Sequence, residues 1–428
     1  MWHLCQRMYR GSHYDGDGGG RVSQREIGAK RFVEVCDGNK AVAYGALLCR
    51  PDVVAVYPIT PQSAVGEWLS RFHDEEILDA EVVRVEGENA SMGVCCSASL
   101  MGGRVFTATS SWGLLFMYDG LFYAAGYRIP VVMTNANRET PGVFTIGNSS
   151  QDMMSVRDTG WVQINTEDCQ EILDLVIMAY RIAEDKDILL PVMVCYDGFY
   201  LSYRKEPIEI PSQEDVDRFL SPLAQNKRMV VSPDDPMVFG APSFFPRFEG
   251  EGCTEFRYTH SAALERVKGK IEEVDREFKV VFNRGYGGQI EEYRTEDAEI
   301  VLVATGSAVG TARVVVDRKR EEGLKVGLVK LRLIRPFPKE KLAQALKGKK
   351  AVGVMDRSVC FGWDCGHLYM EMKAALAFGG VNGMPTINFI AGLANLDITE
   401  GQFERAIDLI ATASKGGAVK DVTWLSLE

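Results

Sequence analysis

Along residues 37–210, the arrangement of hydrophobic and polar residues switches repeatedly between two patterns. Short apolar runs typical of buried strands are separated by longer segments whose apolar residues recur with a helical period. The expected strands are 52–57, 82–85, 105–109, 130–133 and 191–196, and the expected helices are 39–48, 64–72, 89–101, 114–125 and 172–183. Strands that alternate with helices predict a doubly wound parallel sheet, and strands that are apolar throughout indicate that both faces of that sheet are covered.

The same alternation returns between residues 298 and 410, after a stretch rich in proline and acidic residues. Strands are expected at 299–305, 326–331 and 350–355, and helices at 339–346 and 368–376. We therefore expect two α/β domains. The predicted division is a flexible tail at 1–36, a first domain at 37–205, a linker or crossing arm at 206–260, a second domain at 261–412 and a tail at 413–428.

Composition and charge narrow the class of protein. The chain has 428 residues, of which 46% are hydrophobic and 25% charged, and its formal net charge is −11. These values are ordinary for a globular protein, and the negative charge disfavours a general role in binding nucleic acid. No apolar run approaches the length that spans a membrane, and residues 1–30 lack the apolar centre of a signal peptide. We expect a cytoplasmic protein.

The ten cysteines do not form a metal-binding pattern. None belongs to a C-x-x-C pair, and the spacing of Cys360 and Cys365 lacks the further thiolates that an iron–sulfur or zinc site needs. The chain has only five histidines, which disfavours a histidine relay or a metal centre. No metal site is predicted on this chain.

Polar groups follow three predicted strands. The run from Tyr57 to Ser63 (YPITPQS) ends the first strand, and its two prolines hold Thr60 in a stiff turn. Residues 86–89 (EGEN) follow the second strand, and residues 135–138 (NANR) end a later one. Taken singly, these are a turn, a solvated helix start and a surface arginine. Together they predict one site at the carboxyl edge of the sheet.

These runs resemble the alpha subunit of 2-oxoacid:acceptor (ferredoxin) oxidoreductases, the pyruvate:ferredoxin oxidoreductase family. The resemblance covers residues 38–412 and follows the family order. It rests on 57–61 (YPITP), 106–111 (FTATSS), 135–138 (NANR), 157–161 (RDTGW), 190–193 (LPVM), 197–199 (DGF), 293–298 (YRTEDA), 335–338 (RPFP), 356–357 (DR) and 388–393 (NFIAGL). It implies a pyrimidine-type thiamine-diphosphate domain followed by a domain like the carboxyl-terminal domain of transketolase.

The resemblance also implies the chemistry and the partners. Such enzymes oxidatively decarboxylate a 2-oxoacid with thiamine diphosphate and usually form an acyl-CoA, while electrons pass through iron–sulfur clusters. The cofactor is shared with a beta subunit that carries the diphosphate and Mg²⁺ site. A gamma subunit and a ferredoxin-like subunit with [4Fe-4S] clusters complete the complex. The run Gly16-Asp17-Gly18 mimics a thiamine-diphosphate metal signature but lacks its context, which agrees with this division of labour.

Residue roles follow from the resemblance. Glu88 matches the glutamate that bonds the aminopyrimidine ring, although Glu86 stays a candidate, and either could be a helix-start carboxylate. Arg138 matches the arginine that pairs with the substrate carboxylate, a task that suits a guanidinium fork. Thr60 matches the threonine that hydrogen-bonds the substrate, and the turn formed by Pro58, Ile59 and Thr60 is expected to contact the cofactor.

Two segments depart from the family pattern. Many pyruvate enzymes carry an Asp-His-Ser-Asp run where residues 148–152 here read NSSQD, and the preceding loop, 139–144, is also unusual. Replacing an imidazole and a carboxylate by two hydroxyls is expected to enlarge the pocket and lower its charge. We therefore expect a substrate bulkier than pyruvate, such as phenylglyoxylate, with neutral loop drift as the alternative.

Other functions stay open at this point. A pyruvate enzyme, a non-catalytic assembly subunit of the same fold and a self-contained transketolase-type enzyme are the alternatives. A fourth is a nicotinamide dehydrogenase that uses the glycine turn at residues 306–311, a turn that tight strand-to-helix packing explains equally well.

Overall fold

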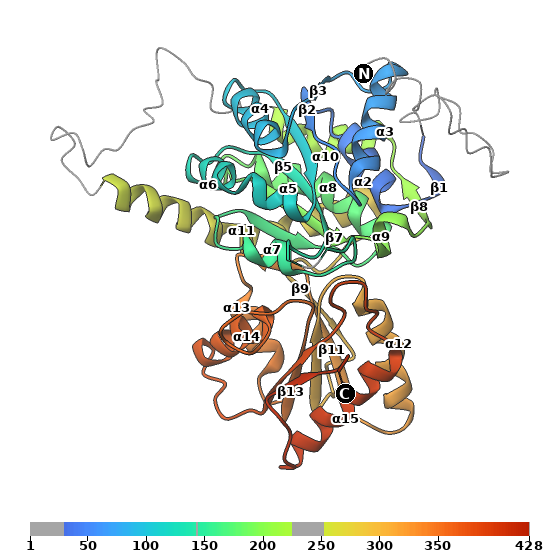
Figure 1. Ribbon diagram of the computed structural model, residues 1–428, viewed down its shortest axis with the longest axis vertical. Coiled ribbons are helices and arrows are strands. Elements are labelled where there is room, and N and C mark those ends of the chain that lie inside the picture. Colours follow the sequence, from blue (N-terminus) through green and yellow to red (C-terminus); the bar gives the residue numbers. More distant parts are fainter. Residues whose placement is uncertain (1–29, 143, 225–251, 428) are drawn as a thin grey trace.

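The computed structural model describes residues 30–142, 144–224 and 252–427, and these form two α/β units (Figure 1). The larger unit is built on a seven-stranded sheet with the order β12-β6-β7-β5-β4-β2-β3. Its strands are β2 (Val53–Val56), β3 (Glu81–Arg84), β4 (Val105–Thr109), β5 (Val132–Asn137), β6 (Val162–Asn165), β7 (Val192–Asp197) and β12 (Leu333–Arg335). All pairings are parallel except that of β12 with β6, as expected for a doubly wound sheet.

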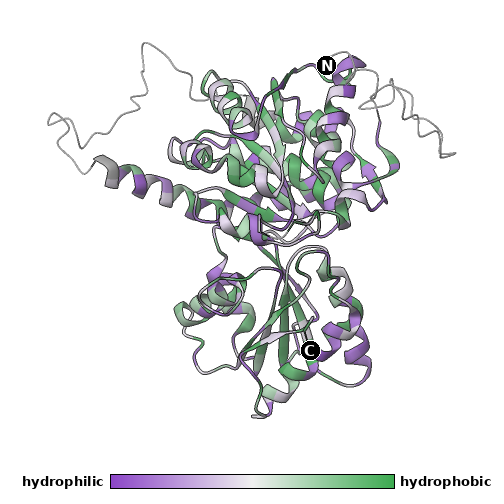
Figure 2. Cartoon of the chain, viewed as in Figure 1, coloured by the Kyte–Doolittle hydropathy of each residue, from purple (hydrophilic) through white to green (hydrophobic). Residues whose placement is uncertain are grey.

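Helices cover both faces of this sheet. One core cluster joins it to α2 (Gly38–Leu48), α3 (Ser63–Asp74) and α8 (Cys169–Ala183), and another joins it to α4 (Glu88–Leu100), α5 (Ser111–Phe116) and α6 (Tyr118–Gly126). Short helices α7 (Gln151–Ser155) and α9 (Tyr200–Tyr203) lie in its connections. Figure 2 shows the central strands as the most hydrophobic part of the chain, which explains why continuous apolar runs predicted them.

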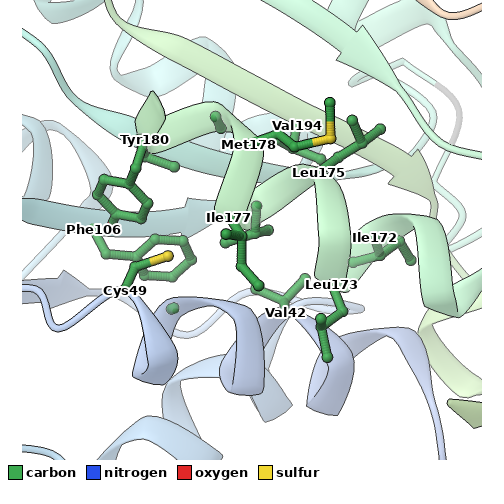
Figure 3. Close-up of a cluster of buried hydrophobic side chains, with 14 of the residues drawn as sticks. Val42, Cys49, Phe106, Ile172, Leu173, Leu175, Ile177, Met178, Tyr180 and Val194 are labelled. Carbon is green, nitrogen blue, oxygen red and sulfur yellow. The ribbon is translucent and has the colours of Figure 1, made fainter. Parts of the chain in front are cut away.

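The contact between α2 and α8 forms the centre of the first core (Figure 3). Side chains of α8 such as Leu173 and Ile177 point toward Val42 of α2, and all three are fully buried. A Cβ on Gly45 would lie 2.9 Å from the Cβ of Val176, so the absence of a side chain lets the two helices approach closely. Each helix begins at an aspartate cap: the side chains of Asp37 and Asp168 accept backbone N–H groups of the first turn.

The smaller unit has a six-stranded sheet with the order β15-β14-β13-β10-β11-β9. Its strands are β9 (Ile290–Tyr293), β10 (Ile300–Ala304), β11 (Val326–Leu331), β13 (Ala351–Asp356), β14 (Thr386–Ile390) and β15 (Val422–Trp424). Helices α12 (Ala308–Glu321) and α15 (Glu400–Ser414) cover one face, and α13 (Lys339–Leu346) and α14 (His367–Phe378) cover the other (Figure 1). Only the β9–β11 pairing within this sheet is antiparallel.

Buried ionic contacts and a shared strand join the two units. Strand β12 follows β11 but pairs with β6 in the larger sheet. The Glu171 carboxylate on α8 accepts hydrogen bonds from Lys330 Nζ at 2.7 Å and Arg332 Nε at 2.6 Å. Burial acts to raise the pKa of Glu171, but these two cations outweigh it and lower the pKa to about 2. The carboxylate is therefore ionised and holds α8 against the second unit.

The structure differs from the expected segment boundaries in three places. Residues within the expected tail and linker form a two-stranded antiparallel sheet of β1 (Phe32–Cys36) and β8 (Glu206–Ile210), which is followed by α10 (Gln213–Ala224). The expected start of the second domain at residue 261 falls inside α11 (Gly252–Phe282), and the expected tail after residue 412 includes β15. Strand β8 was not predicted because its segment is rich in proline, which disfavours strands. Pro207 is nevertheless tolerated, because β8 is an edge strand. Residues 1–29 and 225–251, including the Gly16-Asp17-Gly18 run and the centre of the expected linker, lie outside the described residues.

Candidate active site

The three polar strand ends lie around the point where the strand order of the large sheet reverses. The chain passes from β2 to β3 on one side and then to β4 on the other side of β2. Such a switch point leaves a crevice at the carboxyl ends of the strands, where ligands bind in open α/β sheets. Thr60 follows β2, Glu88 follows β3, and Arg138 follows β5, which pairs with β4.

Thr60 and Arg138 are in direct contact. Arg138 Nη1 donates a hydrogen bond of 2.8 Å to the Thr60 carbonyl oxygen, and its Nε donates one of 2.8 Å to the Thr145 carbonyl oxygen. Among the described residues, none accepts a hydrogen bond from Arg138 Nη2, although the side chain is largely buried. Burial lowers the pKa of Arg138, and nearby Asp152 opposes this shift. The guanidinium is therefore held in place with one nitrogen still available.

A hydrogen bond to its backbone holds the turn that carries Thr60. The Thr60–Pro61 peptide bond is cis, and the Pro61 carbonyl oxygen accepts a hydrogen bond of 2.8 Å from the buried Asn39 side chain. Thr60 itself is exposed, and among the described residues none hydrogen-bonds its hydroxyl. Pro58 is also exposed and Ile59 is half-buried. The turn thus presents its hydroxyl outward from a fixed backbone.

Asp152 connects the strand ends beneath the site. One oxygen, Oδ2, accepts hydrogen bonds from the backbone N–H of Ser111 at 3.0 Å, the side chain of Asn135 at 2.9 Å and the backbone N–H of Arg138 at 3.2 Å. Burial raises the pKa of this carboxyl to about 7, against the effect of these donors. Asp152 therefore fixes the relative position of the turns after β4 and β5.

Glu88 occupies the first turn of α4 with its carboxyl group against the turn after β4. Its side chain is 7% exposed, and burial raises its pKa. The group accepts a hydrogen bond from its own backbone amide, and no other described residue bonds it. A Cβ on Gly113 would lie 2.4 Å from Glu88 Oε1, so only glycine leaves room for this carboxyl. An available, largely buried carboxyl with a raised pKa fits a ring nitrogen as its partner.

The structure separates the two candidate glutamates. Glu86 is exposed and lies before the helix, whereas Glu88 is buried at its start. Burial raises the pKa of the Glu88 carboxyl, as is common for groups at proton-exchanging sites. The geometry therefore favours Glu88 over Glu86.

The segment 148–152 does not lie as the pocket argument expected. Ser149 and Ser150 are buried within the chain, and the Ser150 backbone N–H donates to the Arg357 carbonyl oxygen at 2.8 Å. Ser149 Oγ accepts the Gln151 backbone N–H at 3.0 Å. Because neither hydroxyl lines an open face of the chain, the two serines do not by themselves enlarge a pocket. The exposed part of this region is the preceding loop.

The glycine turn after β10 is filled by a side chain of the first unit. Asp197 Oδ2, at the end of β7, accepts a hydrogen bond of 2.9 Å from the Ser307 backbone N–H and one of 2.7 Å from Arg357 Nη1. A Cβ on Gly306 would lie 2.8 Å from the same oxygen. This close packing favours strand-to-helix packing over a nicotinamide-cofactor site as the explanation of the turn.

Within the described ranges, no group of three or more His, Cys, Asp or Glu side chains is placed to hold a metal ion. Cys360 and Cys365 are free thiols on residues paired across an isolated bridge. In the part of the chain that the structure covers, no helix is both long enough and apolar enough to cross a bilayer.

Sequence reasoning missed the residues that organise the site. Asp152, Gly113 and Ser111 were not proposed as site residues, although all three stand in or beside quoted motifs. Their importance depends on contacts between separate segments, which no local pattern reveals: Asp152 bonds Arg138 across 14 residues, Asn135 across 17 and Ser111 across 41. The only sequence signal was the position of each motif directly after a strand.

Two family models match this chain. One, described as "Pyruvate flavodoxin/ferredoxin oxidoreductase, thiamine diP-bdg", covers residues 44–276, and "Pyruvate:ferredoxin oxidoreductase core domain II" covers residues 298–403. Pyruvate synthase subunit PorA of Methanothermobacter thermautotrophicus is 43% identical over 399 residues, which are 92% of this chain and 98% of that protein. NADH-dependent phenylglyoxylate dehydrogenase subunit alpha of Aromatoleum evansii is 38% identical over 399 residues, covering 93% and 95%.

Solved structures share the fold at lower identity. A 2-oxoglutarate:ferredoxin oxidoreductase from Magnetococcus marinus aligns with a TM-score of 0.65 at 20% identity, over 88% of this chain and 65% of that one. A split-gene transketolase aligns with a TM-score of 0.52 at 13% identity, over 89% and 99%. The expected thiamine-diphosphate domain followed by a transketolase-like domain is confirmed. From its first to its second α/β unit, the chain belongs to the pyruvate:ferredoxin oxidoreductase family of 2-oxoacid oxidoreductases.

Proposed function

We propose that this chain is the catalytic alpha subunit of a multi-subunit, thiamine-diphosphate-dependent 2-oxoacid oxidoreductase and that it supplies half of the active site. The reaction is the oxidative decarboxylation of a 2-oxoacid to an acyl-CoA. One observation carries the proposal: the Glu88 carboxyl is largely buried, no other residue in the described ranges bonds it, and it lies on the same sheet edge as Arg138.

Glu88 is proposed to bond the aminopyrimidine ring nitrogen of thiamine diphosphate. Burial raises the pKa of the Glu88 carboxyl, which brings it closer to that of a ring nitrogen and so suits proton sharing between the two groups. When bound, the cofactor supplies the nucleophilic carbon and the electron sink that decarboxylation needs. The turn of Pro58, Ile59 and Thr60 is proposed to contact the cofactor beside it.

Arg138 is proposed to bind the substrate carboxylate. Nε and Nη1 are occupied by carbonyl oxygens, which orients the guanidinium plane and leaves Nη2 available. A charge-assisted hydrogen bond to a carboxylate is short and strong, and it fixes the substrate with respect to Glu88. The exposed Thr60 hydroxyl is the proposed second contact to the substrate.

Other chains are proposed to complete the site. A beta subunit supplies the diphosphate and Mg²⁺ site, and a gamma subunit and a ferredoxin-like subunit with [4Fe-4S] clusters accept the electrons. The scarcity of metal-ligand clusters on the described part of this chain is compatible with that division. The cytoplasmic location of the complex stays a prediction.

The substrate is proposed to be a 2-oxoacid bulkier than pyruvate, with phenylglyoxylate as the example. Similarity to a phenylglyoxylate dehydrogenase alpha subunit supports this choice. Pyruvate is the second candidate, because pyruvate synthase subunits match at up to 43% identity.

The test uses the complex purified anaerobically with its natural partner chains. Dye reduction is followed with CoA while pyruvate, 2-oxoglutarate, oxalate and phenylglyoxylate are offered in turn. We expect Glu88→Gln to abolish turnover while the complex still assembles, and Glu86→Gln, two residues away and exposed, to leave turnover near wild type. Arg138→Gln is expected to raise KM strongly, with exposed Arg84→Gln as its control. Full turnover by the Glu88 variant would favour an assembly subunit instead.

A further inference from the structure

Two large exposed aromatic side chains contact each other on the segments that carry the proposed site residues. Trp112 is 43% exposed and Phe144 is 89% exposed. Their ring centroids are 6.2 Å apart with an interplanar angle of 78°, so they meet edge to face. Exposing so much aromatic surface is unfavourable in water, which indicates that something covers it in the working enzyme.

Trp112 is held by the residues on either side of it. The Ser111 backbone N–H donates to Asp152 Oδ2 at 3.0 Å, and its hydroxyl donates to the Glu139 carbonyl oxygen. On the other side, Gly113 lies against the Glu88 carboxyl. Because both neighbours are fixed, the indole is tied to the part of the site that holds Glu88.

Phe144 is tied to the opposite part of the site. The next residue, Thr145, gives its carbonyl oxygen to Arg138 Nε at 2.8 Å, and its hydroxyl accepts the Gly147 backbone N–H at 3.0 Å. The phenyl ring therefore projects from the segment that orients the proposed carboxylate-binding guanidinium. The ring contact therefore joins a residue next to Gly113, which lies against Glu88, to a residue next to Thr145, which bonds Arg138.

We propose that Trp112 and Phe144 form an aromatic platform that contacts the side chain of an aryl 2-oxoacid and so determines substrate specificity. This inference rests on the proposed function, since it assumes that the substrate carboxylate binds Arg138. Two rings at 78° offer a face and an edge to a third ring, an arrangement that aromatic groups prefer. A methyl group, as in pyruvate, gains little from this platform.

The aromatic pair, rather than the two buried serines, explains why a bulky substrate would be preferred. Ser149 and Ser150 are buried, whereas Phe144 is exposed and belongs to the loop 139–144, which differs from the family pattern. The specificity signal in that loop is therefore an added aromatic contact rather than an enlarged cavity.

The experiment compares kcat/KM for phenylglyoxylate with kcat/KM for pyruvate in the assembled complex. Phe144→Ala and Trp112→Leu are each expected to lower the aryl-to-methyl ratio by roughly 2- to 13-fold, the range for one aromatic contact. Phe378→Ala is the matched control, because Phe378 is 80% exposed at the end of α14 in the second unit. Its ratio is expected to stay unchanged.

Several results would overturn the platform. An equal loss for both substrates, or loss of the partner chains on purification, would make the pair a structural or subunit contact. A wild-type complex that uses pyruvate but not phenylglyoxylate would refute the platform and leave the proposed function standing. No turnover of any 2-oxoacid would refute both. Phe144→Ala keeps the test decisive if Trp112→Leu fails to fold, because a side chain this exposed contributes little to the core.

Discussion

The position of the Glu88 carboxyl depends on the absence of a side chain at Gly113. Replacing this glycine by alanine adds one Cβ, which would lie 2.4 Å from Glu88 Oε1 and 2.5 Å from Thr109 Oγ1. Gly113 is not among the residues with positive φ, so alanine fits the helical backbone of α5 and the effect is purely steric. The Gly113→Ala variant therefore tests the site without changing any polar group.

The magnitude follows from the overlap. Ordinary contacts of a Cβ begin at 3.4 Å, so the carboxyl has to move by about 1 Å. A displacement of that size near reacting groups costs on the order of 10²-fold in rate, equivalent to about 2.7 kcal/mol. Overpacking adds a destabilisation of about 1–3 kcal/mol. We expect turnover to fall about a hundredfold and the melting temperature of the complex to fall modestly.

The assay is dye reduction by the anaerobic complex, together with thermal unfolding and a check that the partner chains copurify. Gly269→Ala is the matched control: Gly269 lies in α11, and an added Cβ meets nothing within 4 Å. That change is expected to stabilise the helix by about 0.5–1 kcal/mol and to leave turnover unchanged. A Gly113→Ala complex with wild-type turnover would refute the reasoning that Glu88 has to rest against this turn.

The remaining predictions concern stability. Glu171→Gln removes the buried negative charge between Lys330 and Arg332, which keep only Glu167 at 2.9 Å and Glu291 at 3.2 Å as carboxylate partners, and is expected to cost about 3 kcal/mol at pH 7, the low end for breaking a buried ion pair, whereas Glu265→Gln, in an exposed pair, costs little. Because the pKa of Glu171 falls from 4.5 to about 2 on folding, its contribution is complete above pH 4.5 and disappears as the pH falls toward 2. The difference in melting temperature between wild type and variant should therefore shrink over that interval, and a constant difference would contradict the ion-pair explanation. Thr399→Ala removes the capping box of α15 and is expected to cost about 1 kcal/mol in thermal unfolding, so an unchanged melting temperature would refute that role.

The elements that sequence reasoning located are those whose pattern is set by local burial. β4 (Val105–Thr109) and β11 (Val326–Leu331) were predicted with their observed bounds, because every residue of each strand is buried and the apolar run ends at the strand end. Strand β6 was missed, since it is short and carries Gln163 and Asn165 among its four residues. Both polar side chains donate hydrogen bonds outside the strand, Gln163 to the Met153 carbonyl oxygen and Asn165 to the Thr305 hydroxyl.

The site, too, could be predicted only in part from the sequence. Parallel pairing explains why Thr60, Glu88 and Arg138 share one edge, and parallel pairing follows from the alternation of strands and helices that the sequence displays. The hydrogen bonds that orient them could not be predicted, because Asp152 reaches Ser111 across 41 residues and Arg138 reaches Thr60 across 78. The glutamate choice needed burial, a property of the fold: Glu86 and Glu88 differ little in sequence but strongly in environment.

The hydrogen bonds that position the site residues are made by buried groups such as Asp152. The two residues proposed for chemistry, Glu88 and Arg138, keep polar atoms available for ligands. Asp152 accepts backbone and amide donors from two strand ends, so it fixes positions without contributing to the open face. Among the described residues, Arg138 Nη2 and the Glu88 carboxyl have no side-chain partners. Other atoms of the protein hold both side chains in position, so substrate and cofactor can bind them without breaking those contacts. It follows that changes below the edge, such as Gly113→Ala, act through geometry, whereas changes at Glu88 or Arg138 remove a chemical contact. Kinetics on the two kinds of variant should therefore separate positioning from chemistry, because a displaced Glu88 retains residual turnover and an absent carboxyl does not.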